Sequence, residues 1–131
     1  MGLDNGIIAR KTNIIKIDND LSRLSSYAYS DGDFEIAYWR KCYNVRRSIC
    51  RALDGINDNG STFISREELL TIIKELKKFN RKNWSIGGWE GSIWDWSEIK
   101  KSHRTSICRL RRLARLMKKY PNIEVYFYDS Y

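Results

Sequence analysis

The feature that most constrains the fold is a stretch near the C-terminus in which apolar residues recur at helical spacing. The members of this stripe are Ile99, His103, Ile107 (or Ser106), Leu110, Leu113, Ala114 and Met117. The spacing of three and four residues is typical of a helix with one apolar side. We expect the helix to begin near Asp95 or Ser97, and to end at Tyr120 because Pro121 cannot continue a helix.

The same helix is strongly basic. Between Glu98 and Glu124 the chain has nine lysines and arginines and no acid: Lys100, Lys101, Arg104, Arg109, Arg111, Arg112, Arg115, Lys118 and Lys119. Like charges along one helix repel each other, so an anionic partner is the simplest compensation: a phosphate-bearing ligand, a nucleic acid or an acidic protein surface. The alternative is a solvated face, in which lysine and arginine stems cover apolar surface.

The length and the charge of the chain limit the number of its domains and the class of its partners. At 131 residues, the chain is expected to form a single domain spanning residues 1–131. Its net charge of +8 favours anionic partners but does not determine the fold.

The cysteines and the N-terminus bear on the compartment. Cys42, Cys50 and Cys108 form no CxxC pair, which is typical of a reducing cytosol. The first residues lack the pattern of a secretion signal, and no apolar stretch approaches the roughly 20 residues that span a bilayer. We therefore expect a cytoplasmic protein with no membrane contact.

Two further helices are predicted. The first covers residues 33–53, with Asp33 as its N-cap and an apolar stripe that includes Phe34, Tyr38, Cys42, Val45, Ile49 and Ala52. The second follows the capping box Ser65-Arg66-Glu67-Glu68. Its core face is Leu69, Ile72, Ile73, Leu76 and Phe79.

Three segments are predicted to be strands. Residues 12–17 are rich in β-branched side chains and are followed by a turn signal at residues 18–20. Residues 61–64 are a short candidate, and residues 123–128 alternate between apolar and other side chains. The resulting fold class is α+β, with three helices packed on a small antiparallel sheet.

Four segments together carry a family resemblance: residues 1–6 (MGLDNG), 35–41 (EIAYWRK), 92–98 (SIWDWSE) and 127–131 (FYDSY). The chain resembles a family of small proteins encoded by bacteriophages and prophages that begin MGLD and carry an E-[IV]-A-Y-W-R-K motif. The resemblance implies no defined chemistry. It implies the setting of phage accessory proteins, which often counter host defence by binding a nucleotide immune signal or by blocking a defence protein.

One aromatic and basic motif is expected in the first turns of the 33–53 helix. Tyr38 and Trp39 offer rings on which a base can stack, while Arg40 and Lys41, with Arg47 further along, offer cations for phosphate. In the alternative reading, the two rings belong to the core and the cations pair with nearby acids.

A second motif places tryptophans beside glycines. Trp89 and Trp94 lie in the segment 87–96, which also contains Gly87, Gly88 and Gly91. These side chains could hold a purine, because glycine lets backbone approach a ligand closely. Equally, Trp94 could close the core with Trp89 on the surface. The glycine spacing matches neither a P-loop nor a dinucleotide fingerprint.

No catalytic apparatus is visible. His103 lies on the apolar stripe, where a buried, hydrogen-bonded histidine is the expected state. No serine or cysteine is placed beside it by spacing, and one histidine with three scattered thiols does not make a metal site. We expect neither an enzyme nor a cofactor.

These observations lead to a functional prediction. The chain is expected to be a phage-encoded binding protein that sequesters a phosphate-bearing nucleotide signal of host immunity. The candidate ligand-binding residues are Tyr38, Trp39, Arg40, Lys41, Arg47, Trp89, Trp94, Arg104, Arg111 and Arg115. A homo-oligomer is expected, because small binding pockets are often built at symmetric interfaces. The alternatives are inhibition of a host defence effector by protein contact and direct binding of nucleic acid.

Overall fold

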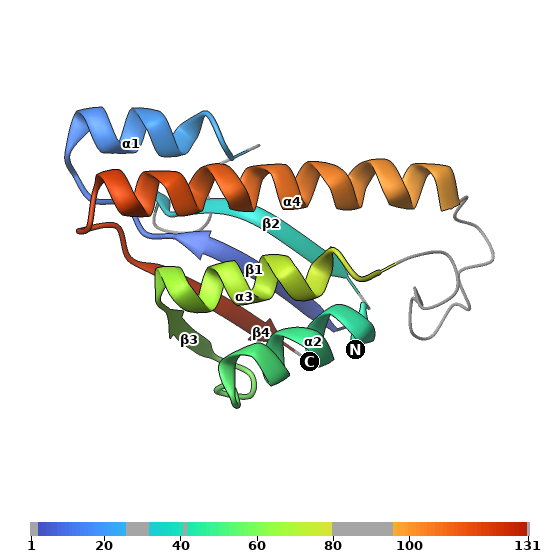
Figure 1. The fold of residues 1–131 in the computed structure, drawn as a ribbon. Coiled ribbons are helices and arrows are strands. Elements are labelled where there is room, and N and C mark those ends of the chain that lie inside the picture. Colours follow the sequence, from blue (N-terminus) through green and yellow to red (C-terminus); the bar gives the residue numbers. More distant parts are fainter. Residues whose placement is uncertain (1–2, 26–31, 41, 80–95, 131) are drawn as a thin grey trace.

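The computed structural model describes residues 3–25, 32–40, 42–79 and 96–130. These residues form an α+β fold with four strands and four helices (Figure 1). In chain order the elements are β1 (Asp4–Ala9), α1 (Ile15–Ser22), β2 (Phe34–Arg40), α2 (Tyr43–Leu53), β3 (Ser61–Ile64), α3 (Arg66–Leu76), α4 (Trp96–Lys119) and β4 (Val125–Ser130).

The sheet is antiparallel and has the strand order β2-β1-β4-β3. The first and last strands of the chain are therefore neighbours at its centre. Ile7 on β1 lies opposite Ala37 on β2 and opposite Phe127 on β4. The β1–β2 register shifts between Ile7 and Ile8, as at a β-bulge, where one strand carries an extra residue.

One face of the sheet is covered by helices. In Figure 1 the helices lie side by side across the sheet, with α4 between α1 and α3. All four described helices contribute buried side chains to the same apolar cluster as the strands, among them Ile17, Ile49, Ile72 and Leu110. We call the sheet face turned toward these helices the inner face and the opposite one the outer face.

The prediction of a helix over residues 33–53 is wrong in its first part. Residues Phe34–Arg40 form strand β2, and helix α2 begins only at Tyr43. The apolar residues Phe34 and Tyr38 fit helical spacing. The side chains of β2 that join the core cluster are instead Phe34, Ile36, Ala37 and Trp39. These positions alternate as in a strand, but the alternation is shifted by one residue at the β-bulge. The shift hides the strand pattern in the sequence.

The predicted strand over residues 12–17 is also wrong, because helix α1 begins at Ile15. Its start is fixed by Asp18, whose carboxylate accepts hydrogen bonds from the backbone amides of Thr12 and Asn13 and from the Thr12 hydroxyl. Asn13 has a positive φ of 64°, a left-handed conformation that asparagine tolerates well. The N-terminal strand is instead Asp4–Ala9, one element earlier.

The described residues from Ser61 onward follow their predictions. Ser65 caps α3, because its hydroxyl accepts from the Glu68 amide while the Glu68 carboxylate accepts from the Ser65 amide. Strand β3 covers Ser61–Ile64, helix α4 ends at Lys119, and a closing strand runs from Val125. The α+β class with an antiparallel sheet is confirmed, while α1 and β2 are additional to the predicted elements.

Candidate anion-binding surface

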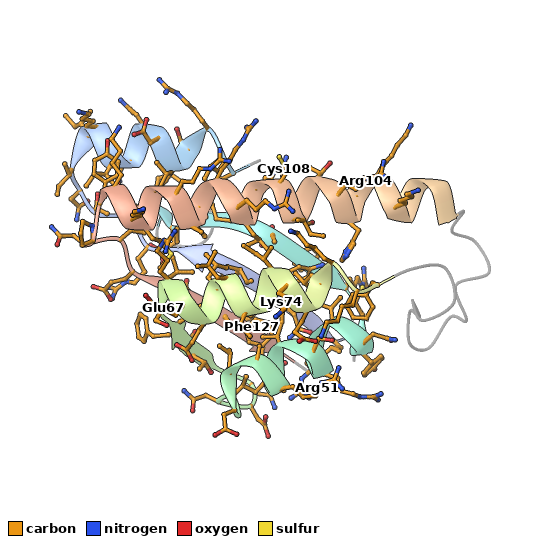
Figure 2. All side chains as sticks on the ribbon, viewed as in Figure 1. Arg51, Glu67, Lys74, Arg104, Cys108 and Phe127 are labelled. Atoms are coloured by element: carbon orange, nitrogen blue, oxygen red, sulfur yellow. The ribbon has the colours of Figure 1, made fainter. Side chains whose placement is uncertain are left out.

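The basic residues of α4 lie on its solvent-facing side. Of the nine cations, all except Arg109 are exposed, whereas His103, Ile107, Leu110, Leu113 and Ala114 are buried. Figure 2 shows Arg104 and Cys108 on the edge of α4 opposite α3. We call the eight exposed lysines and arginines the α4 cation row: Lys100, Lys101, Arg104, Arg111, Arg112, Arg115, Lys118 and Lys119.

Carboxylates of the described residues do not neutralise this row. The ion pairs in the described part of the chain join Arg10 to Glu124, Arg23 to Asp20, Lys78 to Glu75, and Arg46 to both Asp58 and Asp129. All of these cations lie outside α4. The row is therefore a concentration of charge that faces water without a described counter-ion.

The row is long and nearly straight. A helix rises 1.5 Å per residue, so Arg104 and Arg115 are separated by roughly 17 Å and Lys100 and Lys119 by roughly 28 Å along the axis. Arg104, Arg111 and Arg115 project within a narrow sector of the helix, as the spacing predicted. The three arginines can face the same anionic partner.

In strand β2, successive side chains of the predicted aromatic motif point to opposite faces of the sheet, which they would not do in a helix. Trp39 points to the inner face and is 5% exposed, so it belongs to the core. Tyr38 and Arg40 point to the outer face, and Tyr38 is 47% exposed. Burial and the hydrogen bond that its hydroxyl donates to Asp4 raise the pKa of Tyr38 above its usual value.

The candidate residues therefore separate into groups. Arg104, Arg111 and Arg115 are together on α4, while Tyr38 and Arg40 lie on the sheet face that points away from the helices. Arg47 is exposed on α2. Lys41, Trp89 and Trp94 lie outside the described residues.

The register brings together residues that sequence reasoning did not combine. Segments 1–6, 35–41 and 127–131 contain parts of the neighbouring strands β1, β2 and β4. Gly6 lies opposite Tyr38 on one side and Tyr128 on the other. A strand assignment for residues 34–40 is the signal that would have revealed this grouping.

The described residues offer no cluster of three histidines, cysteines or acids for a metal ion. His103 is 8% exposed, and its Nε2 lies 2.6 Å from the Leu76 carbonyl oxygen. A carbonyl can only accept, so Nε2 carries the proton. Burial raises the pKa of the Cys42 thiol to about 11, which keeps it protonated at neutral pH.

In the described part of the chain, no helix combines the length and apolarity that crossing a membrane requires. Comparison with known proteins finds no matching family and no significantly similar curated protein or solved structure.

Proposed function

We propose that the chain is a non-enzymatic binding protein that sequesters a phosphate-bearing nucleotide on the α4 cation row. One observation carries the proposal: eight exposed cations share one side of α4, and no described carboxylate pairs with them. The resemblance to phage proteins supplies the biological setting, in which the ligand is a nucleotide signal of host immunity.

The chemistry of the row suits phosphate. The planar guanidinium of arginine donates paired hydrogen bonds to two phosphate oxygens. An anion on the row would also relieve the repulsion among neighbouring cations, which is a second source of binding free energy. Arg104, Arg111 and Arg115 are the central residues, because they share one narrow sector of the helix.

The length of the row favours a second candidate, an extended nucleic acid. The roughly 28 Å between Lys100 and Lys119 exceeds what one mononucleotide can contact, and duplex DNA presents one charge per roughly 1.7 Å of its axis. A polyanion could contact most of the row at once. Such binding would weaken steeply with salt, whereas a small ligand would release fewer counter-ions.

The test compares two triple variants of equal charge. Arg104→Gln/Arg111→Gln/Arg115→Gln alters the row, while Lys16→Gln/Arg23→Gln/Lys74→Gln removes three exposed cations elsewhere. Melting is measured with cyclic dinucleotides, ADP-ribose derivatives, and single- and double-stranded oligonucleotides. A ligand at 100 times its Kd stabilises the folded state by about 2.7 kcal/mol.

We expect at least one of these ligands to stabilise the wild type and the control triple, with the row triple losing most of the gain. If a nucleotide is bound, the first candidate stands. If only oligonucleotides bind, with a Kd that rises steeply with salt, the second replaces it. The assignment of the row would be refuted if no ligand shifts the melting temperature. It would also be refuted if the two triple variants lose the same share of the ligand-induced stabilisation.

A further inference from the structure

Two adjacent isoleucines are exposed where helix α1 begins. Ile14 is 47% exposed, and Ile15 is 80% exposed, which is the highest value among the large apolar side chains that the structure describes. Single apolar residues are ordinary on protein surfaces and need no explanation. Two in succession leave a continuous apolar area in water, which a partner could cover with a gain in free energy.

The turn before α1 holds the two isoleucines in a fixed position. The Asp18 carboxylate accepts hydrogen bonds from the backbone amides of Thr12 and Asn13. The Thr12 hydroxyl donates to Asp18 and accepts from the Ile14 amide at 3.1 Å. Because the turn is already ordered in the free protein, contact through Ile14 and Ile15 would cost little further conformational entropy.

Exposed lysines also lie at this end of the molecule: Lys11, Lys16, Lys118 and Lys119. Lys11 and Lys16 flank the isoleucines in the sequence. The end of α4 lies beside α1, since the Tyr120 hydroxyl donates to Asp20 at 3.1 Å, and Figure 1 shows the end of α4 at the same end of the molecule as the start of α1. None of these lysines forms an ion pair with a described carboxylate.

The carboxylates of α1 are already engaged. Asp18 holds the turn, while Asp20 accepts from Tyr120 and pairs with Arg23. The apolar pair is therefore bordered by positive charge, and a partner that covers it should be negatively charged around an apolar interior.

The residue types at this end favour a lipid surface over a protein surface. Protein interfaces are depleted in lysine, and their binding energy comes mainly from tyrosine, tryptophan and arginine. A bilayer surface that contains anionic lipids attracts lysines to its headgroups, and apolar side chains can enter the boundary between headgroups and acyl chains. Isoleucine together with lysine is the combination that such a surface fits.

We propose that Ile14 and Ile15 insert into the surface of an anionic lipid bilayer while Lys11 and Lys16 contact its phosphate groups. We call these four residues the isoleucine tip. Lys118 and Lys119 add to the attraction from the end of α4. This contact is separate from the nucleotide binding proposed above. It replaces the expectation of no membrane contact, because a surface contact needs neither a secretion signal nor a spanning helix.

Vesicle sedimentation tests the isoleucine tip. The full chain is mixed with vesicles of phosphatidylcholine alone and of phosphatidylcholine with phosphatidylglycerol, and the bound fraction is measured against lipid concentration. Ile14→Ser/Ile15→Ser removes the apolar pair and should keep the fold, because Ile14 is the N-cap of α1 and serine is a favourable N-cap. Phe63→Ser/Leu70→Ser is the matched control, since it removes two exposed apolar side chains elsewhere. Circular dichroism checks that each variant is folded.

We expect the wild type to bind the mixed vesicles and to bind phosphatidylcholine alone much more weakly. Ile14→Ser/Ile15→Ser should weaken binding to the mixed vesicles about tenfold for each isoleucine removed from the bilayer. Lys11→Gln/Lys16→Gln should weaken it about fivefold for each lysine. Phe63→Ser/Leu70→Ser should bind as the wild type does.

Two results would overturn the isoleucine tip. If the wild type binds neither kind of vesicle, these residues do not contact membranes, and an acidic protein surface is the remaining class of partner. If the isoleucine variant loses no more affinity than the control variant, the cations alone attract the lipid and the isoleucines do not insert. Both results leave the proposed function standing, because that function is tested with soluble ligands and with Arg104→Gln/Arg111→Gln/Arg115→Gln.

Discussion

The Arg46 guanidinium donates two hydrogen bonds to the Asp129 carboxylate, from Nε at 2.8 Å and from Nη2 at 3.1 Å. Asp129 is fully buried and also accepts from the Asn5 side chain at 2.7 Å and from the Asn59 amide at 3.2 Å. Burial alone would raise the pKa of Asp129, but these four donors together lower it. One ionised carboxylate thus connects β4 with β1, α2 and the segment before β3.

Removing this carboxylate should be costly. We expect Asp129→Asn to lower the free energy of unfolding by about 3–5 kcal/mol, because it leaves the Arg46 charge without its buried partner. Urea denaturation measures the change. Asp58→Asn is the control, since the Asp58 side chain is 74% exposed in its ion pair with the same arginine, and should cost about 0–1 kcal/mol. Similar losses in the two variants would contradict the role of Asp129.

His103 should make stability depend on pH. It is the single histidine of the chain, and its pKa is lowered by burial, against the opposing effect of the hydrogen bond to Leu76. The unfolded chain therefore binds the proton more tightly than the fold. The stabilisation is complete above the ordinary value of 6.5 and is lost as the pH falls below it.

Urea denaturation at pH 7.5 and 5.5 tests this expectation. The wild type should be less stable at the lower pH, and His103→Leu should show a clearly smaller difference between the two. A variant with the same pH dependence as the wild type would assign the effect to other groups.

Phe127 should contribute strongly to the core. It is fully buried on the central strand β4, and we expect Phe127→Ala to cost about 3–5 kcal/mol through lost burial and a residual cavity. Phe63→Ala removes the same ring from a 58% exposed position on the edge strand β3 and should cost much less. Thermal or urea unfolding would compare them, and equal losses would show that β4 is not the centre of the packing.

Salt should stabilise the free protein. Repulsion along the α4 cation row is screened when the Debye length falls from about 30 Å at 0.01 M salt to about 8 Å at 0.15 M. We expect the free energy of unfolding to rise over this interval, and to rise less in Arg104→Gln/Arg111→Gln/Arg115→Gln. A loss of stability with salt would mean that attractive pairs dominate the surface.

Sequence patterns predicted the described elements from β3 onward well because their signals are local. The Ser65 capping box and the stop at Pro121 each depend on neighbouring residues, and the α4 stripe repeats over about five turns. The outer face of β2 could not be inferred in this way. Within residues 34–40, Phe34 and Tyr38 fit helical spacing. The segment is nevertheless a strand, because it pairs with β1, which is distant in the sequence.

The candidate site residues also differ in whether a local sequence pattern groups them. The α4 cation row follows from the periodicity of one helix, so Arg104, Arg111 and Arg115 could be grouped from sequence. The grouping of Tyr38 and Tyr128 on either side of Gly6 requires the register of three strands, and no local pattern reveals it. Trp39 was expected at a ligand and lies in the core, because a strand turns successive side chains to opposite faces.

The central position of β1 beside β4 has a consequence for synthesis. Asn5 and Asp129 are in contact although they are 124 positions apart in the chain. A ribosome must complete the last strand before the first can obtain its second neighbour, so the middle of the sheet assembles only after translation of this region has ended. Until then β1 lacks its β4 neighbour, and premature termination before residue 125 would leave a chain that cannot close its sheet.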